Sequence, residues 1–97
     1  MNENYIKLAG MMKALSDETR FKILSMLSDN ELCACMILKE LEITQPTLSY
    51  HMKVLCDSGL VNYRQDGIWM KYTVNIENLR AIEDMLGEIL KRSKRLG

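Results

Sequence analysis

The segment TQPTLSYHMKVLCDSG, residues 44–59, carries the signals that begin, orient and end a helix. Thr44 can cap the helix with its hydroxyl, and Pro46 suits the first turn because its missing N–H costs nothing there. Apolar side chains recur at the spacing of one helix face, namely Leu48, Met52 and Leu55. Gly59 can adopt the left-handed conformation that ends a helix. The sequence therefore predicts an amphipathic helix with a defined start, a defined end and a polar outer face.

Two strand-like runs follow this helix, over residues 60–63 and 69–74. They flank Arg64-Gln65-Asp66-Gly67, and Asp-Gly between such runs is a hairpin signal. A shorter helix is predicted before residue 44, over 32–42, with Ile37, Leu38 and Leu41 pointing inward. This order predicts a helix–turn–helix over about 32–58, followed by a wing over about 60–74.

Further helices flank this unit. Apolar spacing predicts a first helix over 4–15, and Ser16 is the expected N-cap of a second, which has Phe21, Leu24, Leu27 and Ser28 on one face. Asn75 should cap a last helix over about 76–95. The predicted fold is mostly α (α+β), a single winged helix–turn–helix domain over 1–97 with the order α-α-α-α-β-β-α.

Composition sets limits on the partners and the compartment. The chain has 97 residues, of which 47% are apolar, so more apolar surface is expected than one small domain buries. A second copy of the chain, forming a homodimer, is the simplest way to cover this surface. No stretch reaches the length of a membrane span and no signal pattern opens the chain, so a cytoplasmic protein without a membrane partner is expected. Its three cysteines are then expected to be free thiols or ligands.

The polar faces suggest DNA as a partner, although a formal net charge of zero is a weak electrostatic signature of nucleic-acid binding. Amide and hydroxyl groups suit base edges and phosphates, and lysine suits phosphate or guanine. A solvated helix face is the alternative interpretation. The candidate DNA contacts are Gln45, Pro46, Thr47, Ser49, Tyr50, His51 and Lys53 on the helix, with Arg64, Gln65 and Lys71 on the wing. No catalytic constellation can be assembled around His51, so no enzyme is expected.

Four segments, LSDETRFKILSML, ELCAC, TQPTLSYHMKVLCDSGLV and DGIWMKYTVN, together resemble the ArsR/SmtB family of bacterial and archaeal repressors, in its arsenic-sensing branch. The resemblance implies a homodimer that represses a metal- or metalloid-resistance operon until a ligand lowers its affinity for DNA. It also implies dimerisation through the first and last helices (4–15 and 76–95). The residues expected at that interface are Tyr5, Leu8, Met12, Leu79, Ile82, Leu86 and Ile89. A two-fold dimer places its recognition helices ~34–36 Å apart, so the operator should be an imperfect inverted repeat of double-stranded DNA.

The same resemblance assigns the inducer site to Cys33 and Cys35, although Met36 replaces the usual aspartate and Leu38 stands where some members have a third cysteine. Thiolates select soft ions, and two thiols suit As(III) or Sb(III) better than zinc, which normally takes four ligands. No constitutive cofactor is expected. Another soft metal, or no metal at all, remains an alternative. Cys56 is a weaker candidate for a third ligand, and a small cellular thiol could take that place.

The spacing of Cys33 and Cys35 suggests how ligand binding could release the protein from DNA. Two residues along an α-helix differ by about 200°, so two thiols inside a regular helix would face opposite sides. Ligand binding would then unwind the turn over Leu32–Met36 and shift the recognition helix. Two other functions stay open at this point: a repressor that senses redox state through Cys33, Cys35 and Cys56, and a protein-interaction module that uses the wing or the terminal helices.

Overall fold

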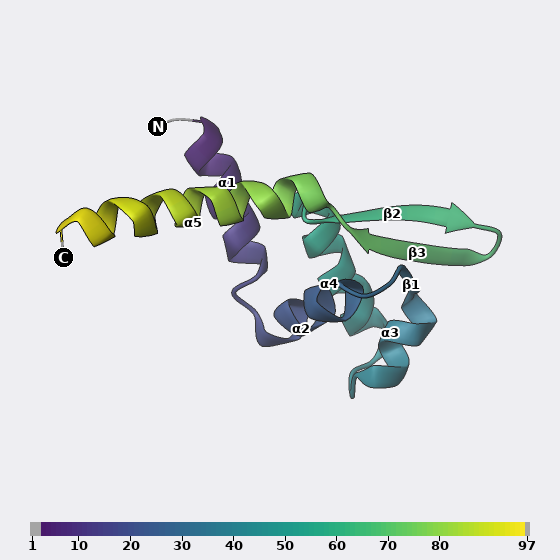
Figure 1. The fold of residues 1–97 in the computed structure, drawn as a ribbon. Helices are drawn as coiled ribbons and strands as arrows, with labels where there is room; N and C mark the ends of the chain where they lie inside the picture. The colour runs from purple at the N-terminus through teal and green to yellow at the C-terminus, as the bar shows by residue number, and fades with distance from the viewer. Residues whose placement is uncertain (1–2, 97) are drawn as a thin grey trace.

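The computed structural model describes residues 3–96 and confirms the predicted order of helices and hairpin (Figure 1). The helices are α1 (Glu3–Ala14), α2 (Glu18–Leu27), α3 (Ala34–Glu40), α4 (Gln45–Ser58) and α5 (Ile76–Leu96). The strands are β1 (Leu32–Cys33), β2 (Val61–Asp66) and β3 (Trp69–Val74). They form an antiparallel sheet in the order β1-β3-β2, so the short strand β1 joins the hairpin along β3.

Helix α4 has the bounds that its sequence predicts. The Thr44 hydroxyl accepts a hydrogen bond from the N–H of Thr47 at 3.4 Å, and Gly59 ends the helix with φ 89°, in the left-handed region. The inner face is buried as expected, with Leu48, Met52 and Leu55 almost inaccessible to solvent. Local capping therefore sets the ends of α4, and the apolar stripe turns one face of the helix toward the core and the polar face toward solvent.

The core lies among α1, α2, α3, α4 and the start of the hairpin. Its fully buried side chains come from all of these elements: Met11, Ile23, Ile37, Leu48, Leu55 and Leu60. Burying one such side chain contributes ~1.5–3 kcal/mol. Because α4 is packed from several sides, it cannot shift without disturbing several of these contacts.

Several details of the helices differ from the prediction, most clearly in α2 and α3. Helix α2 is capped by Asp17 rather than Ser16, because the Asp17 carboxylate accepts a hydrogen bond from the N–H of Arg20 at 3.0 Å. Phe21 is 60% exposed, and Ile23 occupies the core position beside Leu24 instead. The helix predicted over 32–42 begins at Ala34 and ends at Glu40, since residues 32 and 33 pair with β3.

The hairpin is longer than predicted. Strand β2 continues through Asp66, so the residues expected in the turn belong largely to the ladder. The turn lies at Gly67 and Ile68, and Gly67 has φ 63°, a conformation that glycine adopts without a steric penalty. Gln65 donates across this tip to the carbonyl of Gly67 at 3.4 Å.

Helix α5 begins at the body and projects beyond it (Figure 1). Its cap is confirmed, because the Asn75 side chain accepts from the N–H of Asn78 at 3.0 Å. The projecting half exposes Leu86, Ile89 and Leu90. Among the expected interface residues, Tyr5 and Met12 are also exposed, whereas Leu8 and Ile82 are buried in the core of their own protomer. These last two residues hold α1 and α5 to the domain and offer little surface to a partner, while the assignment of the set to a dimer interface stays a prediction.

Within residues 3–96, no helix combines the length and the apolar character needed to cross a bilayer.

Candidate DNA-binding face and thiol pair

The outer face of α4 is polar and open to solvent. Its exposed candidates are Gln45, Pro46, Thr47, Ser49, Tyr50 and Lys53. Lys53 donates to Asp57 at 2.8 Å, one helical turn away, and this hydrogen bond raises the pKa of the lysine. Both side chains are largely exposed, so water screens the pair and the ammonium is free to exchange its partner for a phosphate.

His51 does not share this face. It is buried, and its Nδ1 lies 3.1 Å from Nη1 of Arg20. Because a guanidinium only donates, Nδ1 must accept, which places the proton of a neutral ring on Nε2. The prediction that His51 contacts DNA from the polar face was wrong about its position, since residue type alone does not reveal a buried partner.

Arg20 joins three helices at this point. Its Nε donates to the carbonyl of Ala14, the last residue of α1, at 2.7 Å, while its Nη1 reaches His51 in α4. Its backbone N–H binds Asp17, and that hydrogen bond lowers the pKa of the Asp17 carboxyl. Sequence reasoning missed Arg20. The available signal was an arginine placed three residues after a capping aspartate, whereas its partner His51, thirty-one positions away, leaves no local signal.

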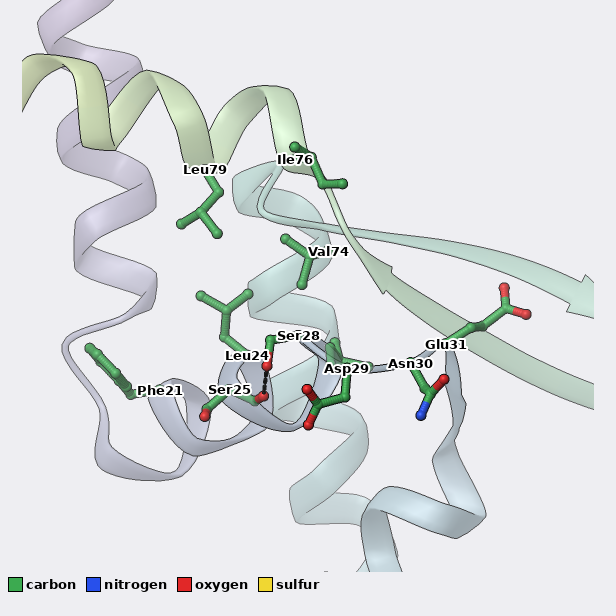
Figure 2. A pocket seen from close by; sticks show the side chains of 11 residues that line it. Phe21, Leu24, Ser25, Ser28, Asp29, Asn30, Glu31, Val74, Ile76 and Leu79 are labelled. Atoms are coloured by element: carbon green, nitrogen blue, oxygen red, sulfur yellow. Dashed lines mark hydrogen bonds between the residues drawn. The ribbon is translucent and has the colours of Figure 1, made fainter.

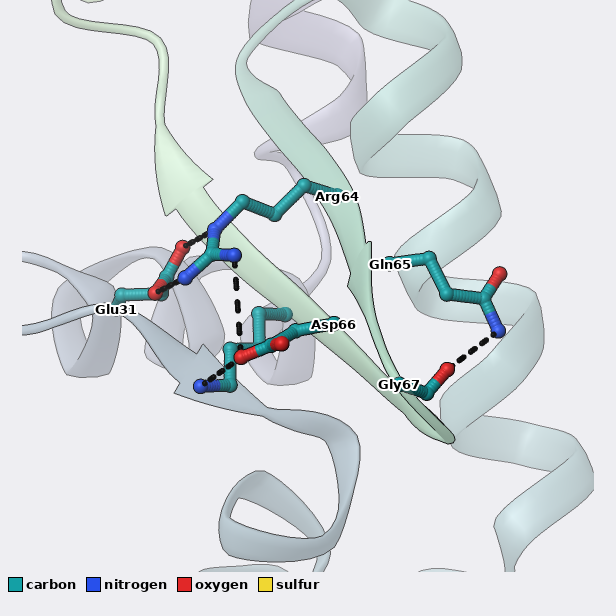
Figure 3. A network of polar contacts seen from close by, with 6 residues as sticks. Glu31, Arg64, Gln65, Asp66 and Gly67 are labelled. Atoms are coloured by element: carbon teal, nitrogen blue, oxygen red, sulfur yellow. Dashed lines mark hydrogen bonds and ion pairs between the residues drawn. The ribbon is translucent and has the colours of Figure 1, made fainter.

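The wing cations lie in ion pairs (Figure 3). Arg64 donates from Nε and Nη2 to the two carboxylate oxygens of Glu31, at 2.8 and 2.7 Å, and Lys71 lies 2.9 Å from Asp66. The bond to Arg64 lowers the pKa of Glu31, and the bond to Lys71 lowers that of Asp66. Glu31 is a second residue that sequence reasoning missed, because nothing local indicates a partner far along the chain.

Cys33 and Cys35 converge where β1 meets α3. Cys33 has the extended conformation (φ −82°, ψ 160°) and precedes the helix, whereas Cys35 lies in its first turn. Their Cα atoms are 5.4 Å apart and the sulfurs are joined in a disulfide. The premise that both thiols lie inside one regular helix and diverge was therefore wrong. They also differ in access, because Cys33 is buried and Cys35 is exposed.

Cys56 lies elsewhere, in a cleft between α4 and the hairpin with Tyr63, Met70 and Tyr72. It is a half-buried free thiol, and burial together with the Asp57 carboxylate raises its pKa, which disfavours the thiolate. No three side chains among His, Cys, Asp and Glu gather as a potential metal site in the described part of the chain. The structure thus brings Cys33 and Cys35 together without Cys56.

A groove of about 550 Å³ opens between α2, the loop after it and the start of α5 (Figure 2). Leu24, Val74 and Leu79 form apolar walls, and polar side chains of residues 28–31 line one side. The exposed Ile76 and Phe21 also border it. The groove is separate from the polar face of α4, and it brings apolar side chains of α2 next to the start of α5.

A polar helix face held over a buried core, with a β-hairpin beside it, defines a winged helix–turn–helix protein. Residues 17–63 match the model of the arsR family of bacterial regulatory proteins. The arsenical resistance operon repressor of Staphylococcus xylosus is 45% identical, over 86% of this chain and 80% of its own length. The chain belongs to the arsR family. Because this is a family of DNA-binding transcriptional regulators, the prediction that the chain is not an enzyme is confirmed.

Two solved structures show the same fold. The ArsR-like transcriptional regulator from Rhodococcus sp. RHA1 superposes with a TM-score of 0.85 at 28% identity, covering 97% of this chain and 89% of its own. Reduced HlyU from Vibrio cholerae N16961 reaches 0.73 at 38% identity, covering 84% and 86%. The predicted fold class is confirmed by these neighbours.

Proposed function

We propose that this chain represses a metalloid-resistance operon in the cytoplasm and leaves its operator when As(III) or Sb(III) binds Cys33 and Cys35. The observation that carries the proposal is the convergence of these two sulfurs at the start of α3, in a domain whose next helix presents the polar face. The name of the Staphylococcus xylosus relative supports the same class of regulated operon.

Base reading is assigned to the exposed side chains at the start of α4. Gln45 can bind adenine with two hydrogen bonds, while Thr47 and Ser49 suit base edges or phosphates, and helix–turn–helix proteins present these N-terminal positions to the major groove. Lys53 and the wing residues Arg64, Gln65 and Lys71 would contact the flanking backbone. His51 acts indirectly, by holding α4 on Arg20.

The donor set favours a thiophilic ion. Two thiolates with no third protein ligand in the described residues are too few for a tetrahedral zinc site. Trivalent arsenic or antimony accepts a pyramidal arrangement of few thiolates, and a small cellular thiol can complete it. The exposed Cys35 is the point of entry, and the buried Cys33 completes the chelate.

The uncovered apolar surface favours a homodimer. Leu86, Ile89 and Leu90 on α5 are each about half exposed, and Ile76 and Phe21 at the groove add further exposed apolar surface. A patch of this kind on a small protein indicates a protein interface. A two-fold pair of such protomers matches an imperfect inverted repeat in double-stranded DNA.

The deciding experiment is a release titration on the inverted-repeat duplex upstream of the gene, followed by fluorescence anisotropy. Arsenite, antimonite, cadmium, zinc and peroxide are compared on the reduced protein. Arsenite or antimonite should weaken binding about 5- to 150-fold, the usual range of allosteric coupling. Cys33→Ser should bind DNA but lose release, whereas Cys56→Ser should behave as wild type. Release of Cys33→Ser at the wild-type arsenite concentration would rule the proposal out.

A second candidate is redox sensing, favoured by the disulfide between Cys33 and Cys35. Peroxide would take two electrons and two protons from the two thiols, forming the S–S bond and two molecules of water. This function predicts release by peroxide without any metalloid, and retention of the complex when arsenite is added to reduced protein. The same titration therefore separates the two candidates.

A further inference from the structure

The short strand β1 connects the thiol pair to the wing. Cys33 stands opposite Lys71 of β3, and Lys71 stands opposite Arg64 of β2. The buried thiol residue and the wing arginine therefore lie on one rung of the three-stranded sheet. Two residues before Cys33, the carboxylate of Glu31 holds the guanidinium of that same Arg64 with two hydrogen bonds (Figure 3).

This rung is linked twice across its width. One link is the backbone ladder from Cys33 through Lys71 to Arg64, and the other is the side-chain pair from Glu31 to Arg64. Asp66 adds a charge contact to both cations, at 2.9 Å from Lys71 and 3.9 Å from Arg64. A bidentate arginine–carboxylate pair fixes orientation as well as distance, so a displacement of residues 31–33 moves the side chain of Arg64 with it.

Resting on the proposed function, we propose that Glu31 is the positioning residue that transmits metalloid binding to the wing. An ion held between the two sulfurs moves Cys33 relative to Cys35, which is anchored in the first turn of α3. Cys33 sits in the ladder, so β1 shifts along β3. Glu31 then draws Arg64 away from the position in which it meets the DNA backbone.

The wing is better suited to this movement than α4. Helix α4 buries three large apolar side chains and His51, so displacing it disturbs the packed core. Strand β2 is exposed from Asn62 onwards, and its polar contacts to Glu31 lie at the surface. Small shifts there break few packing contacts. The route through the wing thus replaces the predicted unwinding of residues 32–36, which assumed diverging thiols.

The test uses Glu31→Gln, which keeps the size of the side chain and removes its charge. Glu42→Gln is the matched control, because it removes one negative charge from the exposed loop before α4. Arsenite binding is measured without DNA, by the ultraviolet absorbance of the arsenic–thiolate bonds. Operator affinity is measured with and without arsenite, and the ratio of the two dissociation constants is compared among variants.

Glu31→Gln should bind arsenite as wild type does, while its affinity ratio falls about fivefold, the lower end of typical allosteric coupling. Glu42→Gln should keep the wild-type ratio. A wild-type ratio in Glu31→Gln, or an equal loss in Glu42→Gln, would overturn the coupling.

Trp69, the single tryptophan, lies at the start of β3 and reports on the wing without DNA. Arsenite should change its accessibility to acrylamide quenching in wild type, and should do so much less in Glu31→Gln. Equal changes in both proteins would also overturn the proposal. Failure of wild type to form arsenic–thiolate bonds would instead contradict the proposed function, so the two failures are distinguishable.

Discussion

The two parts of the molecule that we propose to contact DNA, helix α4 and the wing, are held in place by different forces. Helix α4 is fixed by buried apolar side chains and by the part-buried contact between His51 and Arg20. The wing is fixed by a backbone ladder and by ion pairs such as Glu31–Arg64 at the surface. Apolar burial contributes more free energy than exposed ion pairs do. The helix is consequently the more rigid of the two, and the wing is the part that a small perturbation can move.

The largest expected effect comes from truncating the core beneath α4. Leu55 is fully buried, so Leu55→Ala should lower the free energy of unfolding by ~2–5 kcal/mol through lost burial and a residual cavity. The matched change on the wing is Ile68→Ala, because the Ile68 side chain is 84% exposed. This change should alter the free energy of unfolding by less than ~0.5 kcal/mol. Urea unfolding of both variants checks the contrast, and comparable losses would contradict it.

A smaller effect is expected where α4 meets Arg20. Arg20→Met removes the donors to His51 and to the Ala14 carbonyl, and leaving such partly buried acceptors unpaired should destabilise the fold by ~1–3 kcal/mol. Operator affinity should fall as well, because α4 is then held less firmly in its position on the domain. Lys22→Met, an exposed change on the same helix, is the control for both measurements. Unchanged stability and affinity in Arg20→Met would show that this junction does not hold α4.

The smallest expected effect is the contribution of the Glu31–Arg64 pair on the wing to the free energy of unfolding, and it depends on pH. Arg64 lowers the pKa of Glu31 below its usual 4.5, so the pair stabilises the folded state fully above pH 4.5. That stabilisation is lost as pH falls through the lowered folded-state pKa. The difference in unfolding free energy between wild type and Glu31→Gln should therefore shrink to nothing in acid. Arg64→Gln should remove this pH dependence, and a difference that persists unchanged in acid would refute the assignment.

Features encoded within one helical segment could be predicted from the sequence. Thr44, Pro46 and Gly59 define α4 through local backbone chemistry, and Asn75 does the same for α5. The apolar stripe of α4 likewise identified its buried face, because periodicity and burial coincide there.

Features that depend on distant partners could not be predicted in this way. The two residues of β1 are too few to show a periodicity, and they form a strand only because they pair with β3. The geometry of Cys33 and Cys35 was therefore derived for a helix that does not include Cys33. His51 was assigned to the solvent face by residue type, but Arg20 provides a part-buried donor thirty-one positions away. Glu31 is tied to Arg64 across thirty-three positions. The candidate site was therefore identified by its residue types, while the contacts that make it work were not.

The separation of two positions between Cys33 and Cys35 has a consequence for the denatured chain. Closing so short a loop requires little of the entropy that longer loops lose, so an unfolded molecule can chelate with the same two sulfurs. A ligand that binds folded and unfolded chains alike does not stabilise the fold. On the proposed function, ions bound by this pair alone redistribute folded conformations while leaving the folding equilibrium almost untouched, and a newly synthesised chain can take up the proposed effector before it folds.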